Sequence, residues 1–328
     1  MNYIEILKCP ITNQSLILLD AVTLATADHK YKYPIIDGIL MLNNDYVITA
    51  EDKIENTFDA INRKVQKFYD GKGWKKNDNG DYLDAIEFED LRKDVSSEYL
   101  SRCHYRVSRY LNSKGKYFLD AGSGAIQHKE YLEYSKQYDY RICIDISIEA
   151  LLECKQKLGD KGIYICSNLN NIPLVDNVVD SFIAINVVYH IPADEQIHAI
   201  REMYRVTKQN GKGVVVYDWY KYSQWMNVSL LPFRAFEFFK NKFRRLFKIT
   251  EEYGLYFYVH DLKYLRANLG LGFDVKCWRS ISVPFMKVYI HKYLFGKYLL
   301  DLIWKFEEKN QEKCGLNGEY PMFTFHKD

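Results

Sequence analysis

Residues 120–124 read DAGSG and follow a run of apolar residues, and this loop is the first place where the sequence could hold a ligand. Glycine lets the backbone turn sharply and come close to a ligand at points where any Cβ would collide. Asp145 ends the next apolar run, about twenty residues farther on, where a carboxylate can accept hydrogen bonds from both hydroxyls of a ribose. The loop and the acid together predict a site for a cofactor that contains a nucleoside.

Five short apolar runs must position these residues, and we expect them to be strands. They are Tyr117–Asp120, Arg141–Asp145, Gly162–Cys166, Ser181–Asn186 and Gly213–Tyr217. Most are continuously apolar, as strands buried on both faces of a parallel sheet are. The stretches SIEALLECKQKL and DEQIHAIREMYRV repeat apolar residues at three- and four-residue spacing, which is typical of helices packed on one face. The alternation predicts an α/β fold with a doubly wound sheet.

The sequence divides into four regions by composition. Residues 1–48 read as a small β-rich module, 50–114 as a polar helical segment, 115–218 as the alternating core, and 219–328 as an aromatic, partly helical extension that ends in the strand-like MFTFH. We expect the extension and the segment Phe68–Trp74 to cover the site as lids. His104 and Arg106 stand in a helix leading into the core and fit a structural role as well as a functional one.

The spacing of the glycines separates two cofactor classes. A dinucleotide site uses G-x-G-x-x-G, in which the third glycine lets the helix start pack against the pyrophosphate, and this sequence has Gln127 there. S-adenosylmethionine (SAM) has no phosphate, and backbone groups from Gly122 to Gly124 can hold its methionine end together with nearby polar side chains. The pattern therefore favours SAM over a nicotinamide cofactor.

Several stretches carry a resemblance to a known family. In order along the chain they are FLDAGSGAIQH, RICIDIS, ICSNLNNIPLVDNVVDSFIAINVVYHIP and REMYRVTKQNGKGVVVYDW. Their order and spacing resemble the class I SAM-dependent methyltransferases, especially the branch that includes quinone-biosynthesis and other small-molecule enzymes. The resemblance implies a Rossmann-like core with SAM as its cofactor. Asn168 departs from the acid usual in the family, and TKQNGKG departs from the usual K-P-G-G turn.

The resemblance also implies which residues hold SAM. Asp145 would bind the ribose, Ile146 would lie against the adenine face, and Asn168 with Leu169 would lie near the adenine edge. The full set expected at the cofactor is Asp120, Gly122, Ser123, Gly124, Asp145, Ile146, Asn168, Leu169 and Asn186.

Methyl transfer depends mainly on orienting the acceptor and excluding water. Tyr189 and His190 follow the fourth strand, where the family often brings its acceptor near SAM, and we expect them to be catalytic, with His190 as a base. The alternative is that His190 caps the next helix. The residues expected to contact the acceptor are His128, Trp219, Tyr256, Tyr258 and His260, with Tyr217 and Asp218 beside them. Aromatic residues of this kind also serve as packing residues.

The N-terminal module carries a second resemblance. Cys9-Pro10 and the later YPIIDGI resemble the small zinc-ribbon-derived proteins that activate several methyltransferases as separate subunits. Thr12 stands where a second cysteine would complete C-x-x-C, and one cysteine cannot hold a structural zinc. We therefore expect a metal-free module that packs on the enzyme, either as a structural support or as part of the acceptor entrance, and the sequence points to no metal site elsewhere.

Composition bears on compartment and partners. The 7 cysteines are scattered, and the first residues resemble neither a signal peptide nor a membrane anchor, so we expect a soluble, cytoplasmic protein. The net charge is only +2, yet the chain from Trp219 to Asp328 holds 18 Lys and Arg against 11 Asp and Glu. This excess favours an acidic acceptor or surface as much as it favours a solvated basic face.

Residues 232–248 read as a basic amphipathic helix with phenylalanines along one side. Such a helix can lie on an anionic membrane, which would suit a lipid-linked acceptor. It can equally pack its apolar face on the core as a lid, with its cations in water. We favour the lid.

The leading function is transfer of a methyl group from SAM to a small or medium-sized acceptor, with oxygen favoured over nitrogen and carbon. Two other classes stay open, namely a nicotinamide-dependent oxidoreductase or epimerase and a non-catalytic scaffold with this fold. The intact glycine loop argues against the scaffold. Residues 186–189 read NVVY and lack the [DN]-P-P-[YF] signature of many nucleic-acid methyltransferases, so no nucleic-acid partner is expected.

Overall fold

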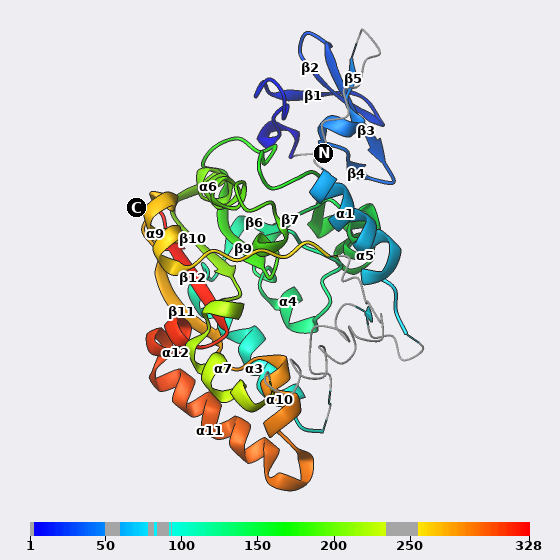
Figure 1. Ribbon diagram of the computed structural model, residues 1–328. Coiled ribbons are helices and arrows are strands. Elements are labelled where there is room, and N and C mark those ends of the chain that lie inside the picture. The colour runs from blue at the N-terminus through cyan, green and yellow to red at the C-terminus, as the bar shows by residue number, and fades with distance from the viewer. Residues whose placement is uncertain (1–2, 50–59, 78–81, 84–91, 93, 234–254) are drawn as a thin grey trace.

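The computed structural model describes residues 3–49, 60–77, 82–83, 92, 94–233 and 255–328. One long sheet runs through the protein, with helices packed against it (Figure 1). Its strands are β1 (Leu16–Asp20), β2 (Thr23–Thr26), β3 (Tyr31–Ile36), β4 (Ile39–Leu40), β5 (Ile48–Thr49), β6 (Gly115–Ala121), β7 (Tyr138–Asp145), β8 (Gly162–Cys166), β9 (Val179–Ile185), β10 (Thr207–Val216), β11 (Asp274–Arg279) and β12 (Tyr320–His326).

Most of the helices lie between strands of this sheet in the sequence. They are α1 (Ala60–Phe68), α3 (Ser97–Arg106), α4 (Lys129–Glu133), α5 (Ile148–Leu158), α6 (Gln196–Val206), α7 (Gln224–Ser229), α9 (Leu262–Leu269), α10 (Val283–Tyr289), α11 (Gly296–Lys309) and α12 (Gln311–Asn317), with a π-helical turn at Tyr69–Gly73 after α1. The side chain of Ser147 accepts a hydrogen bond from the Ala150 N–H, 3.2 Å away, and so caps the start of α5.

The strand order explains where a ligand can bind. The sheet runs β1-β2-β3-β4-β8-β7-β6-β9-β10-β12-β11. The strands from β4 to β10 are parallel, whereas β12 and β11 are antiparallel. From β6 the chain moves outward to β7 and β8, then returns to place β9 on the other side of β6. Such a reversal opens a crevice at the carboxyl ends of the two central strands.

The α/β fold expected from the sequence is confirmed. All five expected strands are present as β6 to β10, although β10 begins at Thr207 and so includes the whole TKQNGKG stretch that replaces the family's turn. The pairing of β10 with β9 shifts register between Thr207 and Lys212, which accommodates that stretch as an irregular strand start. The strand-like MFTFH belongs to β12, whereas no sequence pattern predicted β11.

Both faces of the central sheet are buried. Leu119 and Ile142 belong to a large apolar core that also contains residues of α6 and α9. Their neighbours Phe118 and Cys143 point to the other face and join two further clusters. Because side chains alternate along a strand, burial on both faces gives the continuous apolar runs seen in the sequence.

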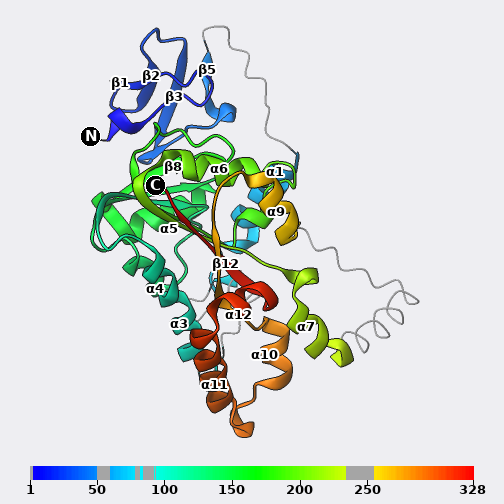
Figure 2. The ribbon, with the colours of Figure 1, turned by 90° about the vertical axis from the view of Figure 1, so that its left-hand side faces the viewer.

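The N-terminal module extends the central sheet. Within the module, β4 is the strand that pairs with the core. It lies parallel to β8, with Ile39 beside Tyr164. The module stands at one end of the molecule, and α10 and α11 stand at the other (Figures 1 and 2). Cys9 is buried, and its sulfur lies 3.1 Å from the hydroxyl oxygen of Tyr33. The lone cysteine is thus part of the packing of the module.

A second apolar core lies beyond the sheet, where α3, α7, α10 and α11 pack together. It contains Cys103, Met226 and Met286. The expected basic helix over 232–248 lies outside the described residues, apart from its first two positions. Among the described helices, none is both long and apolar enough to cross a membrane.

Candidate active site

A cavity opens at the carboxyl ends of β6, β7, β9 and β10, at the reversal of strand order. The expected residues that line it are Gly122, Ser123, Gly124, Asp145, Ile146, Asn168, Leu169, Asn186, Tyr189 and His190. Each ends or closely follows one of the parallel strands β6, β7, β8 and β9. The sheet therefore brings together residues that stand far apart in the sequence.

The glycine loop leaves no room for side chains. Gly122 and Gly124 adopt positive φ angles of +68° and +51°. A Cβ added to Gly122 would lie 2.3 Å from the Val187 side chain, and one added to Gly124 would lie 2.4 Å from the ring of Trp74. Both positions therefore require glycine for conformation and for space.

Asp145 is held rigidly at the end of β7. One carboxylate oxygen accepts a hydrogen bond from the Gly124 N–H at 2.8 Å, and the other accepts one from the Ser147 N–H at 2.9 Å. Burial raises the pKa of Asp145 to about 6, although these two hydrogen bonds oppose the rise. Each oxygen of the ionised carboxylate can still accept a further hydrogen bond, as a pair of ribose hydroxyls would require.

A wall from the segment before the core faces the loop. The ring of Trp74 stacks on Tyr69, with ring centroids 5.0 Å apart, and both residues line the cavity. The side-chain amide of Gln66 donates to the Ile146 carbonyl oxygen at 2.9 Å and ties α1 to the loop after β7. The expected lid segment Phe68–Trp74 therefore lies at the cavity.

Asn186 is a strained residue at the centre of the site. Its φ angle is +56°, a left-handed conformation that is uncommon for residues other than glycine. Its side-chain oxygen is buried and has no hydrogen-bond partner among the described residues, and the same holds for the side-chain oxygen of Asn170 and the indole nitrogen of Trp74. Buried polar groups of this kind are normally satisfied, so a ligand with matching polar groups fits here.

His190 is held in a defined tautomer. Its Nδ1 lies 2.7 Å from the Tyr256 carbonyl oxygen. Because a carbonyl oxygen can only accept, Nδ1 carries the proton, and in the neutral ring Nε2 has a free lone pair. Burial lowers the pKa of His190 to about 4, so the ring is neutral near pH 7. The neighbouring Tyr189 is buried against Phe257 and Tyr217.

Comparison with known proteins agrees with this geometry. Residues 119–215 match the family model described as "Methyltransferase domain". The chain contains a SAM-dependent methyltransferase domain. An uncharacterised protein of Methanocaldococcus jannaschii is 25% identical over 248 residues, which cover 73% of this chain and 97% of that protein.

Two solved structures resemble the methyltransferase in part. A SAM-dependent methyltransferase from Archaeoglobus fulgidus is 15% identical, covers 75% of this chain and 98% of its own, and has a TM-score of 0.44. A chain from a complex that contains the Haloferax volcanii Trm112 methyltransferase activator is 14% identical. The match covers 70% of this chain and 90% of that chain, with a TM-score of 0.41.

The cavity of the methyltransferase fits SAM, its cofactor. The glycine loop offers backbone groups without a Cβ, Asp145 offers acceptors for ribose hydroxyls, and the buried oxygen of Asn186 offers an acceptor for an ammonium group. When bound, SAM supplies an electrophilic methyl group. Its assignment to individual residues remains a proposal.

Several expected residues lie outside the cavity lining. The carboxylate of Asp120 is buried, and one of its oxygens lies 3.0 Å from Nε of Arg141, an ion pair that links β6 to β7 below the loop. The indole nitrogen of Trp219 donates to the Gly315 carbonyl oxygen at 2.7 Å. Both side chains therefore make structural contacts, which the sequence pattern could not separate from binding roles.

In the aromatic segment after the core, the side chains that face the cavity are not the ones that the sequence analysis expected. Phe257 lines the cavity, whereas Tyr256, Tyr258 and His260 do not. The Tyr256 hydroxyl accepts from the Ala193 N–H at 3.1 Å, and His260 stacks on Tyr264. Alternate residues of an extended chain point to opposite sides, so the three expected contacts share a side that faces away from the cavity.

Sequence reasoning missed most of one cavity wall. Tyr131, Trp278, Arg279 and Tyr320 line it together with the expected Asp218. β12 runs antiparallel to β10 and β11 runs antiparallel to β12, so the end of β11 and the start of β12 lie at the same sheet edge as the other site residues. No local signal marks Trp278, Arg279 and Tyr320, because the antiparallel pairing of β11 and β12 with the core places them.

Asp218 gives this wall an unusual electrostatic character. Burial and the nearby charge of Glu319 raise the pKa of Asp218 well above its ordinary value, and Arg279 opposes the rise. The Arg279 guanidinium lies 4.4 Å from the centre of the Tyr320 ring. His128 lies elsewhere, beside His104 and Glu130, although its neighbour Gln127 lines the cavity.

Proposed function

We propose that the methyltransferase methylates an oxygen atom of a small or medium-sized acceptor, bound against the wall formed by Asp218, Trp278, Arg279 and Tyr320. This wall is defined here as the acceptor wall. The observation that carries the proposal is the order of the sheet: β9 lies between β6 and β10, so the loop with Tyr189 and His190 lies between the glycine loop and the acceptor wall. A methyl group held at that loop would lie between SAM at the glycine loop and an acceptor at the acceptor wall.

His190 supports oxygen as the methylated atom. Bound SAM would supply the methyl group and leave as S-adenosylhomocysteine, and the acceptor hydroxyl that takes the methyl group would have to lose its proton. The neutral ring of His190 offers a lone pair at Nε2 that can take this proton. Tyr189 packs beside His190, with ring centroids 4.6 Å apart, and helps to fix the position of the imidazole.

Arg279 supports an acceptor with an anionic group. It is only 2% exposed and lines the cavity, and its guanidinium can bind a carboxylate through two parallel hydrogen bonds. This choice agrees with the basic excess of the C-terminal third, and with it we propose that the protein is akin to the small-molecule branch that includes the quinone-biosynthesis enzymes. The lipid-linked alternative depended on residues 232–248, which lie outside the described residues.

The contacts of the N-terminal module support the proposal that it is a built-in counterpart of the separate activator proteins. It contacts the segment 168–175, which carries the residues expected at adenine: the Lys8 N–H donates to the Pro173 carbonyl oxygen at 3.1 Å, and the Val175 N–H donates to the Ile6 carbonyl oxygen at 2.9 Å. We infer that the module steadies this segment. All seven cysteines are free thiols, which agrees with the cytoplasm as its compartment.

Parallel calorimetric titrations with SAM, S-adenosylhomocysteine and NADH test the cofactor assignment. Micromolar binding of the first two compounds without a signal from NADH is the expected result. Binding of NADH would replace the methyltransferase with an oxidoreductase, and absence of all binding would favour a scaffold.

The acceptor class needs a separate experiment. A panel of hydroxylated acids and their neutral amides is incubated with SAM, and release of S-adenosylhomocysteine is measured for the wild type, Arg279→Gln and the exposed control Arg266→Gln. We expect turnover of an acid, with a KM raised at least about tenfold by Arg279→Gln alone and an unchanged Kd for SAM. Equal turnover of acids and amides by all three proteins would refute the anionic acceptor.

A further inference from the structure

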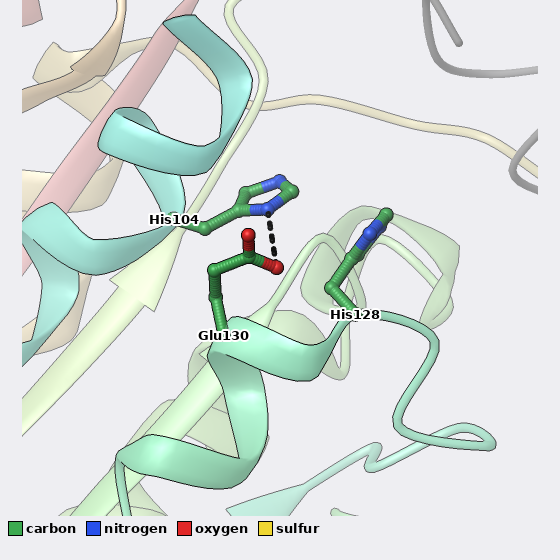
Figure 3. Close-up of side chains that lie close together, drawn as sticks. All are labelled: His104, His128 and Glu130. Carbon is green, nitrogen blue, oxygen red and sulfur yellow. Dashed lines mark ion pairs between the residues drawn. The ribbon is translucent and has the colours of Figure 1, made fainter. Parts of the chain in front are cut away.

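A cluster of metal-ligating side chains lies outside the cavity lining. His104 comes from α3, His128 stands directly before α4, and Glu130 lies in the first turn of α4. One potential ligand atom from each residue lies within 4.8 Å of the others. Figure 3 shows the three side chains pointing toward one another from two elements that are brought together only by the fold.

The distances are close to those of a coordinated ion. Nδ1 of His104 lies 3.9 Å from Oε2 of Glu130. Zinc bonds to histidine nitrogen and carboxylate oxygen are about 2.0–2.2 Å long, so neighbouring ligand atoms of a tetrahedral site lie about 3.4 Å apart. The two imidazole rings have centroids 4.4 Å apart and are tilted by 41°. A small inward movement of these side chains would complete the coordination distances.

A hydrogen bond already orients the carboxylate of Glu130, with Oε2 toward His104. Oε1 accepts a hydrogen bond from the Ser101 hydroxyl at 2.6 Å, which leaves Oε2 on the side of His104. Such outer hydrogen bonds are typical of ligating carboxylates, because they fix the direction of the ligand atom. His104 and Glu130 are 3% and 5% exposed, whereas His128 is half-buried. An ion could therefore enter past His128.

We propose that His104, His128 and Glu130 bind a divalent transition metal, with Zn²⁺ as the best match to two imidazoles and one carboxylate. No fourth His, Cys, Asp or Glu joins the group within the part of the chain that the structure describes. Three protein ligands leave one position for water or another small ligand.

The metal clamps α3 to α4 behind the acceptor wall. The ring of His104 stacks on Trp278, with centroids 5.6 Å apart, and meets Tyr131 edge-on at 5.0 Å. Both of these aromatic residues also line the cavity. Fixing His104 by coordination therefore fixes two rings that contact the proposed acceptor.

Zinc binding by the full chain tests the proposal without SAM or acceptor. The chelator-treated wild type, His128→Gln and the exposed control His198→Gln are titrated with Zn²⁺ in a calorimeter. His128→Gln removes one half-buried ligand and keeps the pair of His104 with Glu130. We expect one zinc per chain in the wild type and the control, and an affinity lower by about 100-fold or more in His128→Gln.

Two further readouts separate coordination from a purely structural cluster. Co²⁺ should give the intense visible absorption of a tetrahedral site in the wild type and the control only. Zn²⁺ should raise the melting temperature of the same two proteins, because it binds their folded state. Equal zinc affinity in all three proteins, or no stoichiometric binding by the wild type, would overturn the proposal and leave a buried ion pair between His104 and Glu130. Either result is independent of whether the enzyme binds SAM.

Discussion

The orientation and the protonation state of the Asp145 carboxylate both bear on the proposed binding of SAM. Its two oxygens are already oriented by backbone N–H groups, so little order has to be created when a ribose binds. Its position also has a cost, because burial raises the carboxyl pKa to about 6. At the proposed ribose site, the hydroxyls would donate to the ionised carboxylate, so a proton on Asp145 would compete with SAM.

We expect the affinity of the wild type for SAM to fall as the pH is lowered through about 6. Asp145→Asn should bind SAM more weakly by about 2 kcal/mol at neutral pH, because it replaces charged hydrogen bonds with neutral ones. It should also lack this pH dependence. Calorimetric titrations at several pH values check both effects. Equal affinities and equal pH profiles for the two proteins would remove Asp145 from the ribose site.

His190 titrates in a different range. Its pKa of about 4 keeps the base neutral well below pH 6, so at saturating SAM the kcat should keep its plateau until the pH approaches 4. His190→Gln should lower kcat by about 100-fold or more and leave the Kd of SAM unchanged. The exposed His198→Gln serves as the control. Wild-type turnover in His190→Gln would show that the acceptor needs no base from this residue.

At the scale of elements, the sequence predicted what depends on neighbouring residues. The parallel strands β6 to β10 are buried on both faces and read as apolar runs, and the site residues that directly follow β6, β7, β8 and β9 could be named for that reason. The acceptor wall could not, since Arg279 and Tyr320 reach it through the antiparallel pairing of β11 and β12. Tyr256, Tyr258 and His260 lie outside the cavity lining and Phe257 lines it, because a shift of one residue along an extended segment exchanges the two sides.

Helix α3 is joined to α11 by a buried ion pair. Arg106 is fully buried; its guanidinium lies 3.0 Å from a carboxylate oxygen of Glu307 and donates to the Trp278 carbonyl oxygen at 2.6 Å. Arg106→Met should destabilise the fold by about 3–5 kcal/mol, because it leaves the Glu307 charge buried and unpaired. The half-exposed Arg109→Met should cost at most about 1 kcal/mol. Urea unfolding measures both, and similar small losses would contradict a structural role for Arg106.

At the scale of the whole molecule, the N-terminal module and the core share both a sheet and an apolar core. Leu7 is fully buried and forms a β-bridge with Leu174, next to the segment expected to hold adenine. Under the proposal that this segment holds adenine, SAM binding depends on the packing of the module. This dependence could not be read from the sequence, because two-residue strands such as β4 carry too little pattern.

Leu7→Ala should lower the free energy of unfolding by about 2–5 kcal/mol through loss of buried area and the cavity left behind. It should also weaken SAM binding under conditions where the protein stays folded. Leu18→Ala, in the same module but 40% exposed, should have little effect on either quantity. Urea unfolding and SAM titration are the measurements. A destabilised Leu7→Ala with unchanged SAM affinity would mean that the module supports the fold but not the cofactor segment.

The pairing of β4 with β8 has a further consequence for how the enzyme responds to dilution. A separate activator leaves its enzyme when both become scarce, since their association depends on concentration. Here β4 lies on the same chain as β8, and its effective concentration is set by the chain that connects the two strands rather than by expression level. The pairing of β4 with β8, and any activity that depends on it, should therefore persist down to the lowest enzyme concentrations.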